Sequence, residues 1–189
     1  MGKGQSRDLQ PALKSRAVFL DRDGVINRVV VKDGRPYPPA SLKELKFFPE
    51  VSEAIQALHD AGFKIIVATN QPDVAKGIQT RGTVEAMHRR IMKELPVDAI
   101  KVCYHAEADR CLCRKPKPGM LLEAAREWSL DLGRSFMVGD RWRDIEAGKA
   151  AGCRTILIPG GYSEKEAEKP DAVVGSLMEA SQYILKQNQ

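Results

Sequence analysis

The chain has 189 residues, of which 43% are hydrophobic, 29% charged and 6% aromatic, and its formal net charge is +5 at pH 7. This composition is ordinary for a soluble globular protein, and no apolar run approaches the roughly 20 residues that are needed to cross a bilayer. We therefore expect one domain over residues 17–189, with a sizeable core and no membrane partner.

The remaining residues, 1–16, are polar and basic and lack the apolar segment of a secretory signal, so we interpret them as a flexible basic tail. Lysines and arginines are dispersed along the chain, without blocks of like charge or interleaved aromatic residues. The positive charge therefore fits an anionic small molecule better than nucleic acid. Three of the four cysteines lie within residues 103–113, which suits a metal site in a reducing cytoplasm better than a disulfide framework.

Apolar strand patterns alternate with amphipathic helix patterns along the chain. Short apolar runs closed by polar or glycine residues predict strands at 18–20, 63–69, 99–104, 136–138, 155–158 and 172–174. Apolar faces predict helices at 49–61, 83–95, 119–129, 142–151 and 176–186. This alternation predicts the α/β class, with a doubly wound, Rossmann-like parallel sheet and right-handed crossovers.

The segment between the first strand and the first helix, residues 25–48, is too irregular for a helix and too short for a large cap domain. We interpret residues 29–31 as part of a flap hairpin. Residues 35–39 contain three prolines, and we interpret them as a stiff loop.

The first strand runs directly into two carboxylates, Asp21 and Asp23, followed by Gly24. Residues at i and i+2 of an extended chain face the same way, so the two carboxylates would project together. Like charges at such a place are costly unless a cation or a substrate uses them, and ligands of open α/β sheets bind at this end of the strands. The alternative is a solvated acidic turn, which the buried character of the preceding run disfavours.

Polar side chains also follow three other predicted strands: Thr69 and Asn70, then Arg114 and Lys115, then Asp140. Taken singly, they could be a turn, a solvated pair and a helix cap. In a doubly wound sheet these ends converge on one crevice. As an ordered set, the four pieces resemble the motifs of the haloacid dehalogenase superfamily of aspartate-dependent phosphatases, over residues 17–158.

The resemblance implies hydrolysis of a phosphate monoester with Mg²⁺ as cofactor. Asp21 would be the nucleophile that forms an aspartyl phosphate, and Asp23 would protonate the leaving oxygen and then activate water. Asp21, Asp140 and the backbone carbonyl of Asp23 would hold Mg²⁺, which prefers oxygen ligands.

Further roles follow from the same resemblance. Lys115 would screen the charge around the nucleophile, and Asp144 would support the metal ligands. The expected substrate-binding residues are Thr69, Asn70, Arg114 and Arg141.

A second cluster of metal-ligating residue types precedes the basic pair, and it consists of Cys103, His105, Cys111 and Cys113. Three thiols and one imidazole suit tetrahedral Zn²⁺, and a closed set of four protein ligands indicates a structural site. The alternative is a group of unrelated core cysteines. Zinc here would shape the loop that carries Arg114 and Lys115. Cys153, by contrast, is interpreted as a small core residue, and His59 and His88 as structural.

The zinc-loop pattern narrows the resemblance to the capless branch that contains the heptose bisphosphate phosphatases and the histidinol-phosphate phosphatase domains. It implies a small phosphorylated sugar as the substrate, first D-glycero-D-manno-heptose 1,7-bisphosphate losing its 7-phosphate, and we expect a monomer. Segments 69–71 and 113–120 look more like the heptose enzymes. The short spacing from His105 to Cys111 is similar to the histidinol-phosphate branch, and Arg141 stands where the heptose branch commonly has lysine.

Three alternatives stay open at this point. Histidinol phosphate is the second candidate substrate, and a 3′-phosphorylated polynucleotide is a more distant one that the basic charge would suit. A zinc-stabilised binding module without catalysis is the alternative from another class of protein, although the retained aspartates and Lys115 disfavour it.

Overall fold

The computed structural model describes residues 14–187. Most of the predicted basic tail, residues 1–16, thus lies outside the described residues, and Arg16, its last member, already belongs to the first strand. Among the described residues, no helix combines the length and the apolar character that a membrane crossing requires.

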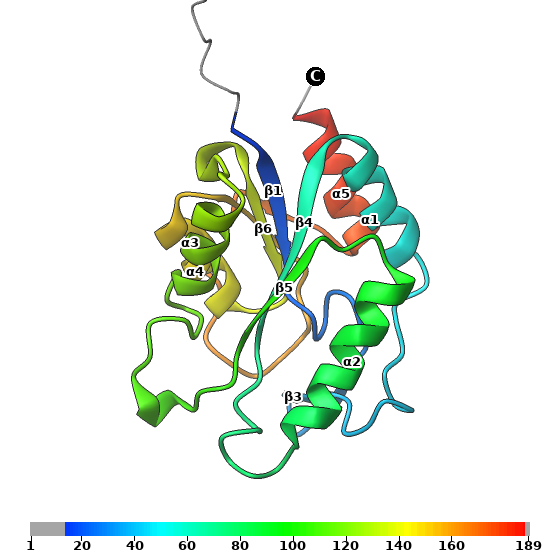
Figure 1. Ribbon diagram of the computed structural model, residues 1–189, viewed down its shortest axis with the longest axis vertical. Coiled ribbons are helices and arrows are strands. Elements are labelled where there is room, and N and C mark those ends of the chain that lie inside the picture. The colour runs from blue at the N-terminus through cyan, green and yellow to red at the C-terminus, as the bar shows by residue number, and fades with distance from the viewer. Residues whose placement is uncertain (1–13, 188–189) are drawn as a thin grey trace, which may run out of the picture.

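A six-stranded sheet forms the centre of the protein, with strand order β5-β4-β1-β6-β7-β8 (Figure 1). Every neighbouring pair in it is parallel. The strands are β1 (Arg16–Leu20), β4 (Phe63–Asn70), β5 (Ala99–Cys103), β6 (Phe136–Gly139), β7 (Arg154–Leu157) and β8 (Ala172–Val173). The helices are α1 (Val51–Asp60), α2 (Arg81–Glu94), α3 (Gly119–Glu127), α4 (Trp142–Ala151) and α5 (Leu177–Lys186). The predicted doubly wound parallel sheet is confirmed.

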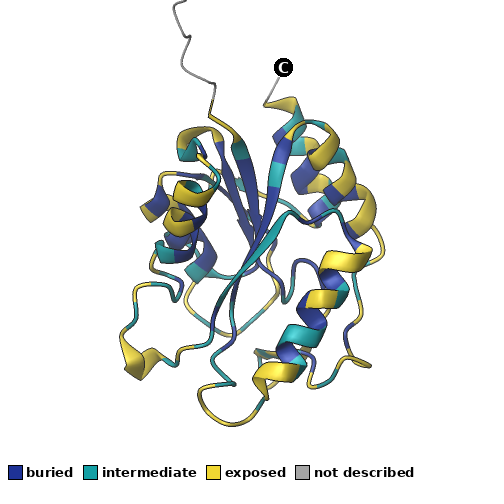
Figure 2. Cartoon of the chain, in the orientation of Figure 1, coloured by how far each residue is buried: buried dark blue, intermediate teal, exposed yellow. Residues whose placement is uncertain are grey.

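Helices cover both faces of the sheet and create two cores (Figure 2). Side chains of β1 alternate between them, with Val18 and Leu20 in the core under α1, α2 and α5. Ala17 and Phe19 lie in the core under α3 and α4. Because both faces of β1 are covered, the strand is apolar throughout, as expected for a central parallel strand.

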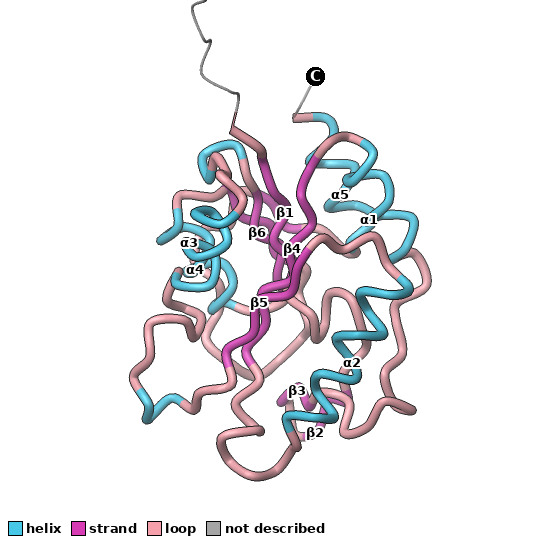
Figure 3. Tube along the Cα trace, in the orientation of Figure 1, coloured by secondary structure: helices cyan, strands magenta, loops and turns pink. Residues whose placement is uncertain are grey.

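The strand order reverses direction beside β1, since β4 and β5 follow on one side and β6, β7 and β8 on the other. Such a switch point opens a crevice at the carboxyl ends of the strands. Long loops gather at this end of the sheet, together with a small hairpin (Figure 3).

That hairpin consists of β2 (Val30–Lys32) and β3 (Arg35–Tyr37), paired antiparallel. The prediction of a flap hairpin at 29–31 is confirmed, but the interpretation of 35–39 as a stiff loop is wrong for residues 35–37, which form β3. Asp33 and Gly34 adopt positive φ angles of 49° and 69°, which is the backbone of a tight two-residue hairpin turn. An isolated two-stranded ribbon tolerates proline because each strand has an edge without ladder hydrogen bonds.

Element boundaries otherwise differ from the predictions by a few residues. Shifts of two residues occur at β1, α1, α2 and α3, and α2 begins at Arg81 rather than at residue 83. The side chain of Thr80 accepts a hydrogen bond from the backbone N–H of Thr83 and so caps the helix earlier.

Candidate active site and metal-binding loop

Four side chains from separate parts of the chain meet beyond the carboxyl end of β1. Lys115 Nζ donates to Asp21 Oδ1 at 2.8 Å and to the carbonyl of Ala68 at 2.6 Å. It also forms an ion pair with Asp144 Oδ1 at 2.5 Å. Asp140 follows β6, and its carboxylate lies within 4.8 Å of those of Asp21 and Asp144. The fold therefore brings together one ammonium and three carboxylates, all buried.

With three carboxylates and one ammonium, this buried cluster contains more acidic than basic groups. Burial, opposed by Lys115, raises the pKa of Asp21 to about 6. Burial and the neighbouring carboxylates of Asp21 and Asp144 raise the pKa of Asp140 well above its usual range. Burial would lower the pKa of Lys115, but Asp144 and Asp21 raise it above the ordinary value, so the ammonium stays charged. The site would gain stability from a further cation.

The donor set fits Mg²⁺. Asp140 Oδ1 is buried without a hydrogen-bond partner, while Oδ2 accepts from the hydroxyl of Tyr162 at 2.6 Å. A carboxylate oxygen of this kind, beside two other carboxylates, is what a hard divalent cation binds. Gly24 permits the close approach, because a Cβ there would lie 1.9 Å from Asp140 Oδ2.

Asp23 is held from three directions. Arg22 donates to both of its carboxylate oxygens, with NH2 at 3.0 Å from Oδ1 and 2.8 Å from Oδ2. Asn27 Nδ2 donates to Oδ1 at 2.9 Å, and Gln71 Nε2 donates to Oδ2 at 2.8 Å. Burial alone would raise the pKa of Asp23, but Arg22 and the hydrogen bonds lower it below its usual range.

Two residues that we expected to bind phosphate are engaged with the protein. The amide of Asn70 bonds the backbone of Lys115 twice, since Nδ2 donates to the carbonyl at 3.0 Å and Oδ1 accepts from the N–H at 3.1 Å. Thr69 Oγ1 is buried and accepts from Gln71 Nε2 at 3.0 Å. Their contact with phosphate stays a prediction, whereas a role of Asn70 in placing Lys115 is visible.

A cleft of about 720 Å³ opens over this cluster. Its walls include the β2–β3 hairpin and the loop after β7, which are joined where Ser163 N–H donates to the carbonyl of Gly34 at 2.8 Å. The cations that line it are Arg35, Lys76, Arg114, Lys115, Arg141 and Arg143. A cleft of this size and charge suits a small molecule with more than one anionic group.

The two arginines expected to bind substrate differ in their surroundings. Arg141 is paired with Glu164 through two guanidinium nitrogens, with Nε 2.9 Å from Oε1, and these contacts raise its pKa above the usual range. Arg114 has a longer contact, 3.4 Å, from NH1 to the carbonyl of His105. Arg114 is therefore the freer of the two to bind an anion.

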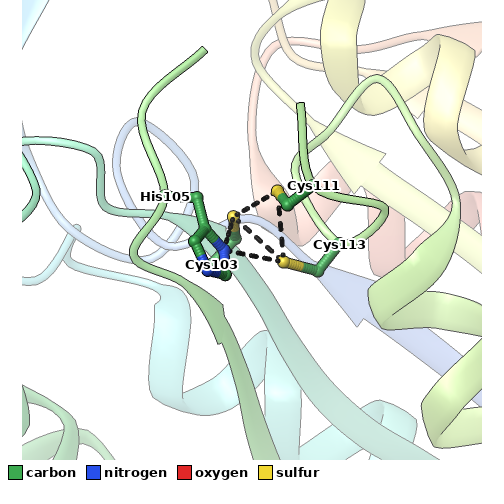
Figure 4. Close-up of side chains that lie close together, drawn as sticks. All are labelled: Cys103, His105, Cys111 and Cys113. Carbon is green, nitrogen blue, oxygen red and sulfur yellow. Dashed lines mark hydrogen bonds between the residues drawn. The ribbon is translucent and has the colours of Figure 1, made fainter. Parts of the chain in front are cut away.

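The second predicted cluster is also assembled, from Cys103 at the end of β5 and three residues of the loop that follows (Figure 4). Its sulfur–sulfur distances are 3.7 Å for Cys103–Cys111, 3.2 Å for Cys103–Cys113 and 3.5 Å for Cys111–Cys113. His105 Nδ1 lies 3.6 Å from the sulfur of Cys103 and 3.3 Å from that of Cys113. No disulfide links them, as all four cysteines of the chain are free. Ligands about 2.3 Å from one tetrahedral Zn²⁺ would lie roughly 3.7 Å apart, so the spacing fits zinc.

Several residues of the site were missed by sequence reasoning. Tyr162 and Glu164 lie in an irregular loop, and nothing in their local pattern signals a functional contact. Gln71 directly follows the second motif, and Arg22 stands between the two aspartates, so their positions in the motifs were an available signal.

Comparisons with known proteins place these features in a family. The Hydrolase-like family model, described as HAD-hydrolase-like, matches residues 112–180. D-glycero-beta-D-manno-heptose-1,7-bisphosphate 7-phosphatase of Rhodopseudomonas palustris is 38% identical over 162 residues, covering 79% of this chain and 84% of the relative. The D-glycero-alpha-D-manno-heptose-1,7-bisphosphate 7-phosphatase of Photorhabdus laumondii is 32% identical over 187 residues, covering 90% and 97%.

A solved structure agrees with these relatives. The D,D-heptose 1,7-bisphosphate phosphatase of B. bronchiseptica, complexed with magnesium and phosphate, superposes with a TM-score of 0.75 at 32% identity. The match covers 91% of this chain and 99% of that one.

Proposed function

The chain belongs to the haloacid dehalogenase (HAD)-like phosphatases, and we propose that it removes the 7-phosphate of D-glycero-D-manno-heptose 1,7-bisphosphate. The observation that carries the proposal is the buried group of Asp21, Lys115 and Asp144 beside the unpartnered oxygen of Asp140. The names and the coverage of the relatives support the choice of substrate.

In the first half of the proposed reaction, an oxygen of Asp21 attacks the phosphorus atom of the substrate. The bond from phosphorus to the sugar oxygen breaks, and an aspartyl phosphate forms. Asp23 gives a proton to the departing sugar oxygen. Because Arg22 and the hydrogen bonds lower the pKa of Asp23 in the free protein, this carboxyl must take up that proton when the substrate binds. Lys115 lies 2.8 Å from Asp21 and offsets the repulsion between the carboxylate and the phosphate dianion.

In the second half, Asp23 takes a proton from a water molecule, which attacks the phosphorus atom and releases Asp21 and inorganic phosphate. Asp21, Asp140 and the backbone carbonyl of Asp23 would hold Mg²⁺. The ion would supply charge neutralisation and alignment of the phosphate oxygens when bound. Asn70 would keep Lys115 in place through its two hydrogen bonds to the Lys115 backbone.

A bisphosphate offers a second anion at a distance from the reacting one. Arg114, which lines the cleft beside the metal-binding loop, would bind that second phosphate with its planar guanidinium. Structural Zn²⁺ on Cys103, His105, Cys111 and Cys113 would fix the loop that carries Arg114. We predict that the protein is a monomer and that it is located in the cytoplasm.

The test is phosphate release from both anomers of heptose 1,7-bisphosphate, from histidinol phosphate and from a 3′-phosphorylated oligonucleotide. We expect the highest kcat/KM with one heptose bisphosphate anomer and a requirement for added Mg²⁺. Asp21→Asn is the inactive control for contaminating phosphatases. Equal or higher kcat/KM with histidinol phosphate would overturn the proposed substrate, because that molecule has no second phosphate for Arg114.

A further inference from the structure

Among the described residues, Arg22 is the most deeply buried arginine, with 1% of its surface exposed. Arginine is rarely buried unless its charge is paired. Here Nε and NH2 donate to Asp23, with Nε 3.2 Å from Oδ1. The remaining terminal nitrogen, NH1, lies 3.2 Å from Nε2 of His88. The guanidinium therefore lies between a carboxylate and an imidazole.

His88 reaches this position from α2 and is 8% exposed. Because a guanidinium can only donate, Nε2 of His88 must accept, and the ring proton must lie on Nδ1. Burial, followed by the charge of Arg22, lowers the pKa of His88 to about 4, although Asp23 and Glu85 oppose the shift. The imidazole is thus neutral at pH 7, as an acceptor for Arg22 requires.

Neither side chain belongs to the described lining of the cleft, in which Asp23 does take part. Arg22 and His88 therefore act on a substrate only through Asp23. The two remaining donors to Asp23, Asn27 and Gln71, bond one oxygen each. Only the planar fork of Arg22 bonds both oxygens, and a planar fork fixes the plane of a carboxyl group in a way that a point charge does not.

We propose that Arg22 and His88 form a positioning pair for proton transfer, in which His88 orients the guanidinium of Arg22 and Arg22 orients the carboxyl of Asp23 toward the leaving oxygen. The inference rests on the proposed function, because it assumes that Asp23 is the general acid. It assigns a chemical role to a histidine that the sequence pattern alone indicated to be structural.

The experiment compares two substitutions of similar size at one buried position. His88→Gln keeps an acceptor that can reach Arg22, whereas His88→Leu removes it. Each variant is assayed with heptose bisphosphate, whose sugar oxygen must be protonated to leave, and with p-nitrophenyl phosphate, whose leaving group departs without a proton. The readout is kcat/KM, which covers the steps up to release of the leaving group.

We expect His88→Leu to lower kcat/KM on the heptose bisphosphate by about 10- to 100-fold, part of the effect of a general acid. The same variant should lower kcat/KM on p-nitrophenyl phosphate less than about threefold, and His88→Gln should stay near the wild type on both. If His88 had a purely structural role, its loss would lower kcat/KM on both substrates alike. Equal losses of kcat/KM in His88→Leu, or no loss on either substrate, would therefore overturn the proposal.

Two further variants keep the test decisive. Arg22→Lys retains the charge but loses the planar fork, and it replaces His88→Leu as the test if that variant does not fold. We expect it to lower kcat/KM selectively on the heptose bisphosphate. Equal losses of kcat/KM on both substrates would again overturn the positioning pair. Asp23→Asn tests the premise. A selective loss in Asp23→Asn without one in His88→Leu and Arg22→Lys would remove only the positioning pair, whereas equal losses in Asp23→Asn would remove the general acid and the pair together.

Discussion

The two clusters of this protein, the carboxylate–lysine group and the cysteine–histidine group, are built in opposite ways. Residues 103–113 supply every member of the second cluster. The first joins Asp21 to Lys115 and Asp144, which are far apart in sequence. Asp21 and Lys115 are buried, whereas His105 is exposed. The spacing of residues within one short segment can specify a metal-binding loop. A buried cluster of charged side chains from distant segments is held together only by the folded sheet.

The comparison predicts that damage to the first cluster removes chemistry, whereas damage to the second removes stability. The strongest case is Asp21→Asn, an almost isosteric change. We expect kcat to fall by at least about 1,000-fold, as for the loss of other nucleophiles, with little change in thermal unfolding because Lys115 keeps its contact with Asp144. Steady-state kinetics and calorimetry measure the two effects. Near wild-type rates would show that Asp21 is not the nucleophile.

Cys111→Ser tests the opposite side of the comparison. The protein purified without chelators should contain about one Zn²⁺ per chain, and the variant should lose zinc. We expect Tm to fall by roughly 10 °C, which corresponds to about 3 kcal/mol for a chain of this size. Cys153→Ser is the matched control, since Cys153 lies outside the cluster, and its zinc content should not change. A folded, reduced protein without zinc would contradict the assignment.

Arg114 lies where the two clusters meet, so its removal should affect substrate choice rather than chemistry or folding. Arg114→Ala is expected to lower kcat/KM on the heptose bisphosphate by roughly 10- to 100-fold, the ~1.5–3 kcal/mol of a hydrogen bond to a charged group. The kcat/KM of the same variant on a generic phosphate monoester should fall much less. Arg126→Ala, on the exposed face of α3, is the control for loss of surface charge. Equal losses on both substrates would place Arg114 at the reacting phosphate instead.

The smallest expected effect concerns the pH dependence of stability near the first cluster. His88 has a pKa of about 4 in the folded protein against 6.5 when unperturbed. Between these values the unfolded chain binds the proton and the folded chain does not, so stability falls as the pH drops from 6.5 toward 4. At pH 5 the loss amounts to about 1–2 kcal/mol.

Denaturant unfolding at pH 7 and pH 5 measures this loss. His88→Gln should lose less stability over the interval than the wild type. Zinc release at low pH affects the wild type and His88→Gln alike, so its contribution cancels when the changes in their free energies of unfolding are compared. An identical pH dependence would show that His88 is protonated without penalty in the folded state.

The sequence by itself determined the parallel sheet, the order of the motifs and the four members of the cysteine–histidine cluster. Each depends on short-range geometry: an apolar run makes a buried strand, residues two apart face the same way, and ligands within a short loop can close around one point. The strand pattern also predicts that the carboxyl ends of the parallel strands meet at one edge of the sheet.

Only the tertiary structure decided which polar groups become partners. Packing brings Asn70, whose contact with the phosphate stays a prediction, to the backbone of Lys115. His88, from α2, reaches Arg22, and Tyr162 reaches Asp140 from a loop without a recognisable pattern. Such contacts join residues 22 or more positions apart. They depend on how the helices and loops pack against the sheet, and local spacing carries no information about that packing.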